Sequence, residues 1–221
     1  DKMLYKSTFL DLRCFEMALI TEEDVTRTKL YAHERQREEL KRKVSSLEDW
    51  LRGLRIKVKI EKVNKGNLQR AVQLLNKTNQ MNLSSRRMSE LEVMAWANVE
   101  NHWFWTVRVS DKFGDSGLTG VISLELSNSE GQIIDFVLSC RVMGRKIEET
   151  MLFVIIKYAK IIGCNKIWAK YIPTQKNKPC FEFWRESNFL FNEKGNIFSW
   201  DFSKDYPLPD YIELLEEGIV F

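Results

Sequence analysis

The residues with the clearest chemical potential lie in one short segment, residues 136–149. An apolar run ends at Cys140, and a basic turn containing Arg141, Gly144 and Arg145 follows before a long apolar helix pattern begins. The first backbone N–H groups of a helix lack intrahelical partners and attract anions, and the same field, like nearby arginines, favours a thiolate. The segment therefore predicts a phosphate-binding turn with Cys140 as a nucleophile beside it.

Each of these residues also has a simpler interpretation. A free cysteine at a strand end is usually a small buried hydrophobe, and a basic helix start is often just solvated. The other cysteines, Cys14, Cys164 and Cys180, have no comparable basic setting and are expected to be structural.

Three further polar segments are candidates for ligand contact. The loop between Lys77 and Arg87 is rich in amides and cations, which suit an anionic ligand but also occur in helix-capping loops. Asp115 lies in a glycine-flanked turn, where it is a turn former or a general base. The segment after a predicted strand at 167–172 faces the same choice between ligand contact and helix capping. The candidate residues are Thr78, Asn79, Gln80, Asn82, Arg86, Arg87, Thr174, Lys176 and Asn177.

Composition excludes several classes of protein. The 221 residues are 44% hydrophobic, which predicts a real core, and the net charge of +3 is too small to indicate nucleic-acid binding. Two histidines and no C-x-x-C pair argue against a metal site. Sparse cysteines predict a reducing, cytoplasmic location, and no apolar run is long enough to span a membrane.

The elements that must position these residues are predicted by periodicity. Residues 1–53 form a charged helical connector, with a capping box at 21–24 and a second helix capped at 45–48. Residues 54–203 read as strand, two helices, three antiparallel strands, helix, strand, helix and two strands, whereas residues 204–221 form an acidic tail that is surface-packed or disordered. This order predicts an α/β (α+β) domain with a mixed, mostly antiparallel sheet flanked by helices.

That order, with the turn Arg141-Val-Met-Gly-Arg145 opening the central helix, resembles the GNAT acyltransferase fold. The resemblance implies that the turn holds a pyrophosphate of coenzyme A. The typical GNAT turn has a further small residue after its glycine, where this chain has Arg145 and Lys146, and this disfavours ordinary acetyl-CoA binding.

Four motifs in order resemble the FkbH-like family: residues 77–87, 112–117, 138–145 and 171–177. Proteins of that family join a HAD-type phosphatase-like domain to a C-terminal GNAT-like domain. The resemblance implies transfer of a glyceryl unit from 1,3-bisphosphoglycerate to an acyl carrier protein, with loss of phosphate, for polyketide or related biosynthesis. The chain contains no Asp-x-Asp pair, so we expect the C-terminal part, with the HAD domain on the same polypeptide.

The resemblance assigns roles to the candidates. Cys140 would carry the acyl group as a thioester. Arg141, Gly144 and Arg145 would hold a phosphate of the donor or of a phosphopantetheine or coenzyme A ligand, and the loop at 78–87 would recognise the three-carbon unit. Two alternatives remain: a non-catalytic domain that docks the carrier, and a free-standing N-acetyltransferase that uses acetyl-CoA.

Overall fold

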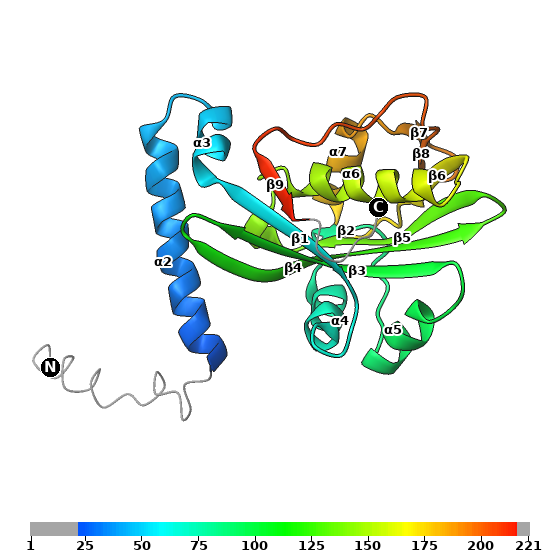
Figure 1. The fold of residues 1–221 in the computed structure, drawn as a ribbon, viewed down its shortest axis with the longest axis horizontal. Helices are drawn as coiled ribbons and strands as arrows, with labels where there is room; N and C mark the ends of the chain where they lie inside the picture. The colour runs from blue at the N-terminus through cyan, green and yellow to red at the C-terminus, as the bar shows by residue number, and fades with distance from the viewer. Residues whose placement is uncertain (1–21, 216–221) are drawn as a thin grey trace, which may run out of the picture.

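The computed structural model describes residues 22–215, with side chains from residue 29 onward. One nine-stranded sheet runs through this part of the chain in the order β7-β8-β6-β5-β4-β3-β1-β9, and β2 pairs with β5 off this path (Figure 1). The strands are β1 (Ile56–Lys62), β2 (Met81–Asn82), β3 (His102–Asp111), β4 (Gly114–Ser127), β5 (Glu130–Leu138), β6 (Lys166–Lys170), β7 (Leu190–Asn192), β8 (Ile197–Trp200) and β9 (Ile212–Leu215).

Helices cover both faces of this sheet. They are α2 (Glu22–Lys43), α3 (Leu47–Leu54), α4 (Leu68–Lys77), α5 (Glu90–Ala97), α6 (Ile147–Ile161) and α7 (Lys178–Glu186), with a 3₁₀ turn, η2, at Cys140–Val142. Helices α6 and α7 pack on one face, and α4 and α5 on the other (Figure 1). Most strand pairs are antiparallel, whereas β5–β6 and β1–β9 are parallel. The predicted mixed, mostly antiparallel sheet is confirmed.

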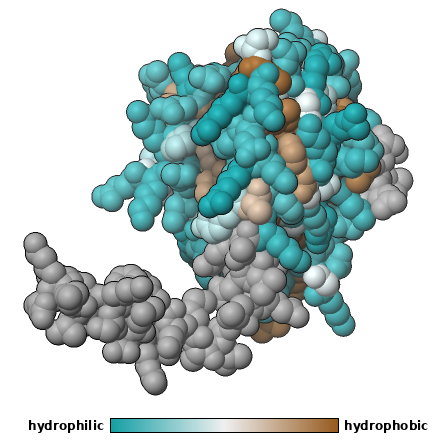
Figure 2. Space-filling view, turned by 90° about the vertical axis from the view of Figure 1, so that its left-hand side faces the viewer, coloured by the Kyte–Doolittle hydropathy of each residue, from teal (hydrophilic) through white to brown (hydrophobic). Residues whose placement is uncertain are grey.

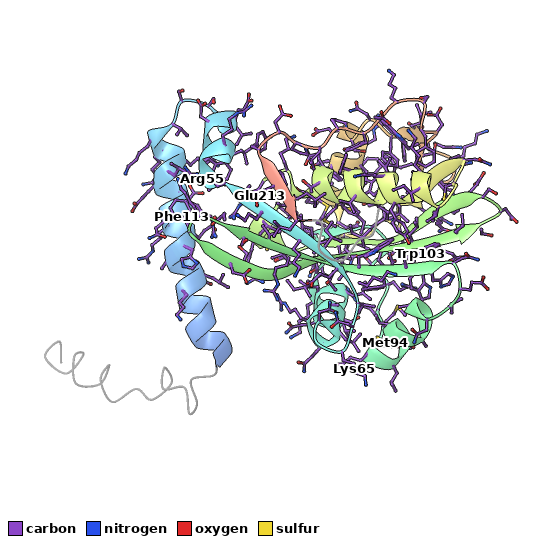
Figure 3. The ribbon with its side chains drawn as sticks, viewed as in Figure 1. Arg55, Lys65, Met94, Trp103, Phe113 and Glu213 are labelled. Carbon is purple, nitrogen blue, oxygen red and sulfur yellow. The ribbon has the colours of Figure 1, made fainter. Side chains whose placement is uncertain are left out.

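The larger core lies between the sheet and α6. Side chains from β3 such as Trp103 point into this layer (Figure 3). Trp105 and Tyr158 meet edge to face there, with ring centroids 4.8 Å apart. Alternation along β1 places its apolar row in this core, whereas β3 and β4 also send Phe104 and Val121 to the smaller core under α4 and α5. Apolar side chains on the two faces of the sheet therefore form two separate cores, one under α6 and α7 and one under α4 and α5.

The predicted connector packs on the domain. Ser46 caps α3 by accepting the N–H of Asp49, and Trp50 and Leu51 are buried in the main core. The Trp50 indole donates to the carbonyl of Arg37 on α2 (3.1 Å), which ties the two helices together. The side of the molecule near α2 is largely hydrophilic with a narrow apolar band (Figure 2). The capping box predicted at 21–24 begins outside the described residues.

The described part of the predicted acidic tail packs on the domain, which is one of the two expected alternatives. Ile212 pairs with Ile56, so β9 extends the sheet beside β1, and Tyr206 is buried. Pro207, Pro209 and the acidic residues concealed this short strand in the sequence. The part of the tail that is described is therefore an element of the fold.

Within residues 22–215 no helix combines the length and the hydrophobicity needed to cross a bilayer. The same part of the chain brings no three His, Cys, Asp or Glu side chains together in a way that would hold a metal ion.

Candidate functional site

The candidate site forms where the two central parallel strands end. Strands β5 and β6 run in the same direction, so their carboxyl ends meet at one edge of the sheet. Cys140 follows β5 as the first residue of η2 and is exposed. Arg141 is also exposed, its Nε–H donates to Ser139 Oγ (3.4 Å), and no carboxylate of the described residues pairs with it. The thiol and the guanidinium are therefore both accessible at this edge.

The predicted loops reach the same edge. Strand β2 is antiparallel to β5 and pairs Met81 with Leu138, so the register carries Gln80 and Asn79 toward Ser139 and Cys140. The segment after β6 places Thr174 and Lys176 at this edge as well, and Lys176 is exposed. The fold thus brings three predicted segments to the same edge of the sheet.

Asn82 and Asn177 do not face a ligand, contrary to the sequence prediction. Both are fully buried. Asn82 accepts the N–H of Ser85 (2.8 Å) and donates to the carbonyl of Thr78 (2.9 Å). Because these amides are satisfied by the chain itself, they are structural residues.

The paired arginines are also structural. Arg86 forms an ion pair with the buried carboxylate of Asp135 and lies over the ring of Trp96, 4.9 Å from its centroid. Arg87 donates to the carbonyl of Leu75 and to Asn79 Oδ1. These contacts close the end of α4 and anchor the loop, which corrects the prediction of a free anion-binding pair.

Asp115 and Thr174 have the structural roles that the sequence offered as alternatives to catalysis and ligand contact. The carboxylate of Asp115 accepts the N–H of Gly117 (2.7 Å) and pairs with Arg108 (2.9 Å), as a turn former does. Thr174 Oγ1 accepts the backbone N–H groups of Lys176 (3.3 Å) and Asn177 (3.2 Å), so it caps the loop before α7.

Arg145 points away from the predicted phosphate turn. Its guanidinium is buried and donates to both carboxylate oxygens of Glu34 on α2, at 2.9 and 2.8 Å. Asp111, at the end of β3, lies 3.8 Å away and also binds Arg37 at 2.6 and 3.0 Å. Sequence reasoning missed this cluster because Glu34, Arg37 and Asp111 are far from Arg145 in the chain. The expected anion ligand Arg145 is instead an anchor for α2.

The turn itself is occupied by a side chain. The backbone N–H of Gly144 donates to Glu148 Oε1 (3.0 Å), and the other carboxylate oxygen of Glu148 is buried with no partner. Burial raises the pKa of Glu148 from 4.5 to about 7. Lys146 adopts a left-handed conformation (φ 65°) directly before α6, where a small residue would fit without strain. The one sequence signal for Glu148 was its position in the first turn of α6.

The remaining cysteines of the described chain differ from Cys140. Cys164 and Cys180 are both buried, and burial raises the pKa of each thiol, that of Cys180 to about 12. Cys14 lies outside the described residues. Among residues 22–215, Cys140 is therefore the thiol exposed for reaction.

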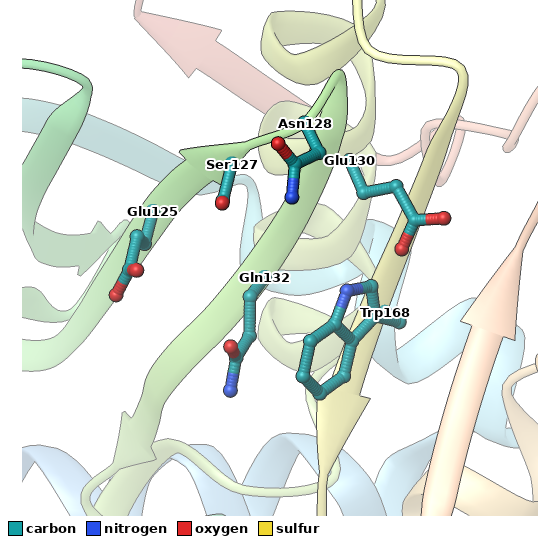
Figure 4. A pocket seen from close by; sticks show the side chains of 6 residues that line it. All are labelled: Glu125, Ser127, Asn128, Glu130, Gln132 and Trp168. Carbon is teal, nitrogen blue, oxygen red and sulfur yellow. The ribbon is translucent and has the colours of Figure 1, made fainter.

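A hollow lies at the opposite end of β5 from Cys140. It measures about 320 Å³ at the β4–β5 hairpin and is lined by Glu125, Ser127, Asn128, Glu130, Gln132 and Trp168 (Figure 4). Its position beyond the amino end of β5 separates it from Cys140 by the length of that strand.

No family model and no curated protein matches this sequence. Among solved structures, an acetyltransferase of the GNAT family from Staphylococcus aureus Mu50 is similar at 13% identity and a TM-score of 0.51, over 64% of this chain and 97% of that one. The chain has the GNAT fold. A GNAT-like architecture was therefore a correct expectation.

Two more solved structures are similar to this GNAT-fold chain. A domain from Methanocaldococcus jannaschii has 15% identity and a TM-score of 0.51, over 66% of this chain and 99% of the other. The PaiA N-acetyltransferase from Thermoplasma acidophilum, in complex with coenzyme A, has 18% identity and a TM-score of 0.47, over 64% and 96%.

The turn of this GNAT-fold domain does not fit a coenzyme A pyrophosphate in the described conformation. The N–H of Gly144 is bonded to a carboxylate, which would repel a phosphate when ionised. Arg145 is committed to Glu34, and Lys146 to Glu149.

Proposed function

We propose that this GNAT-fold domain is an acyltransferase in which Cys140 accepts an acyl group and passes it to the phosphopantetheine thiol of an acyl carrier protein. The supporting observation is the exposed Cys140 thiol just beyond the carboxyl end of β5, adjacent in sequence to the exposed Arg141, whose guanidinium has no carboxylate partner within residues 22–215. A thiol in this position is open to both a soluble donor and a protein-borne acceptor.

The proposed donor is an acyl phosphate, and the FkbH-like resemblance suggests 1,3-bisphosphoglycerate. The Cys140 thiolate attacks the acyl carbonyl, the bond to the phosphate oxygen breaks, and inorganic phosphate leaves as the carbon–sulfur bond forms. Arg141 would stabilise the departing phosphate. The carrier thiolate then attacks the thioester carbonyl and regenerates the Cys140 thiolate.

The partners of this proposal follow from the same resemblance. A HAD phosphatase-like domain, on the same polypeptide, would remove the remaining phosphate of the glyceryl unit. The loop at 78–80 and the segment at 174–176 lie at the same edge of the sheet as Cys140 and would contact the acyl group or the carrier. A reducing cytoplasm keeps the thiol free.

Carrier loading with the Cys140→Ser variant tests this function. We expect loss of at least 100-fold in the rate of acyl transfer to holo-carrier, with an unfolding midpoint close to that of the native chain, because the residue is exposed. Cys180→Ser, at a buried thiol away from solvent, serves as the control and should retain transfer after correction for its folded fraction. Full transfer by Cys140→Ser would refute the covalent route.

A second candidate is a non-catalytic domain that docks the carrier. The observation that favours it is the internal occupation of the turn by Glu148. This function predicts that carrier binds equally well to native chain and to Cys140→Ser, and that no cysteine becomes acylated.

A further inference from the structure

The two parallel strands at the centre of the sheet separate toward the candidate site. Strand β5 pairs with β6 only over Glu130–Ile133 and Lys166–Ala169, although β5 continues to Leu138. The rest of this β5 edge carries backbone groups that need partners. An extended ligand with amide groups, such as pantetheine, is the kind of chain that pairs with an open strand edge.

Residues 81–83 fill this gap. Met81 pairs with Leu138 and Asn82 with Val137, and the N–H of Leu83 donates to the carbonyl of Phe136 (3.1 Å). On the other side, the N–H of Ile172 donates to the carbonyl of Leu83 (3.0 Å). Leu83 therefore bridges β5 and the segment that leaves β6.

The side chains of the inserted segment are held as firmly as its backbone. Met81 and Leu83 are buried in the main core, at 2% and 0% exposure. The side-chain amide of Asn177 donates to the carbonyls of Asn82 (3.0 Å) and Ile172 (2.9 Å), on both sides of the closure. Its oxygen accepts the Tyr171 hydroxyl (2.7 Å) and the N–H of Thr174 (2.7 Å). One buried amide thus joins the inserted segment to the chain that leaves β6.

We propose that residues 81–83, fixed by Asn177, form a built-in strand that excludes free coenzyme A and makes the domain selective for thiols carried by a protein. With the gap closed, the β5 edge between Phe136 and Leu138 has no free backbone groups left for a pantetheine chain, so affinity must come from contacts with the protein that bears it. Tethering supplies the effective concentration that a free thiol of the same chemistry lacks. Asn177 is a positioning residue in this arrangement. The selectivity for a carrier rests on the proposed function, whereas the closure and the exclusion of coenzyme A do not.

Two measurements on the native chain test the exclusion. Titration calorimetry with coenzyme A up to about 1 mM should show no saturable heat, which corresponds to a Kd weaker than millimolar. Hydrogen exchange should show the amides of Leu83 and Ile172 protected to the same degree as those of the β4–β5 pair. Saturable binding at micromolar coenzyme A, or rapid exchange at these two amides, would overturn the proposal.

The role of Asn177 is tested by Asn177→Asp, which keeps the shape but replaces two donors with an acceptor. We expect exchange of the Leu83 and Ile172 amides to accelerate at least 10-fold, while Asn98→Asp, at an exposed asparagine, leaves it unchanged. Unchanged exchange in a folded Asn177→Asp protein would contradict the role of Asn177, and if that variant does not fold, the native measurements still decide the closure. These results do not depend on Cys140, whose acylation is measured separately.

Discussion

Replacing Glu148 with glutamine should make the protein more stable at alkaline pH. The carboxylate of Glu148 is 4% exposed, accepts the N–H of Gly144 and has one buried oxygen without a partner. Glutamine has the same shape and can still accept that N–H, but it carries no charge to be buried. The difference in the free energy of unfolding between the two proteins therefore measures the cost of ionising the Glu148 carboxyl in the folded state.

The magnitude follows from the pKa. Burial raises the pKa of Glu148 from 4.5 to about 7, and one pKa unit corresponds to about 1.4 kcal/mol. Because the folded value lies above the unfolded one, the unfolded state releases its proton first as the pH rises. The contribution of Glu148 to stability is thus fully present below pH 4.5, declines between 4.5 and 7, and stays lost above 7. Between pH 5 and pH 8 the native chain should lose about 2 to 3 kcal/mol relative to Glu148→Gln.

Urea unfolding of both proteins at pH 5, 6, 7 and 8 measures this difference, since other titrating groups cancel between them. Glu149→Gln is the matched control: the neighbouring carboxylate is partly exposed and pairs with Lys146, so removing its charge should change the free energy of unfolding by no more than about 1 kcal/mol. A constant difference between native and Glu148→Gln from pH 5 to 8 would refute the reasoning.

Other predictions follow from single contacts. Gly114→Ala should destabilise the fold by about 2 to 4 kcal/mol in thermal unfolding, because the added Cβ would lie 2.3 Å from the His33 ring at a φ of 154°. Gly117→Ala, at φ 73° with open space around it, should cost only about 1 to 2 kcal/mol. Equal losses in the two variants would show that the His33 contact is unimportant. Arg86→Leu should lower the free energy of unfolding in urea by about 3 kcal/mol, because it leaves the fully buried Asp135 carboxylate without its cation. Adding Asp135→Asn to this variant should recover part of the loss, and additive losses would contradict the coupling. Under native conditions an aromatic disulfide reagent should label Cys140 within seconds and Cys164 and Cys180 at least 100-fold more slowly, as read by peptide mapping, and equal rates would contradict the described burial.

Local patterns were sufficient for most of the fold. Alternation in β1 and the β3–β4–β5 strands, the Ser89 capping box of α5 and the apolar run of α6 each specify their own element. Strands β2 and β9 were missed because each is short and lies in a polar or proline-containing stretch, where pairing with a distant strand decides the structure.

The site was harder to predict than the fold for the same reason. Residue types placed Cys140 and Arg141 correctly at a turn between a strand and a helix. The partners of Arg86, Arg145, Asn82 and Asn177 come from other parts of the chain, and a polar side chain looks the same in sequence whether it awaits a ligand or satisfies a buried group. Local sequence cannot separate these cases, because the tertiary pairing alone determines which donors remain free.

The central claim is that Cys140 forms the acyl–enzyme bond. Its most direct test is to incubate the chain and its HAD partner domain with 1,3-bisphosphoglycerate generated in place, quench in acid before carrier is added, and map the acyl group by peptide mass spectrometry. We expect a hydroxylamine-sensitive adduct on the peptide that contains Cys140. This adduct should be absent from Cys140→Ser and should be lost from the native chain when holo-carrier is added. An adduct on a different residue, or carrier loading with no protein-bound acyl group at any time, would contradict it.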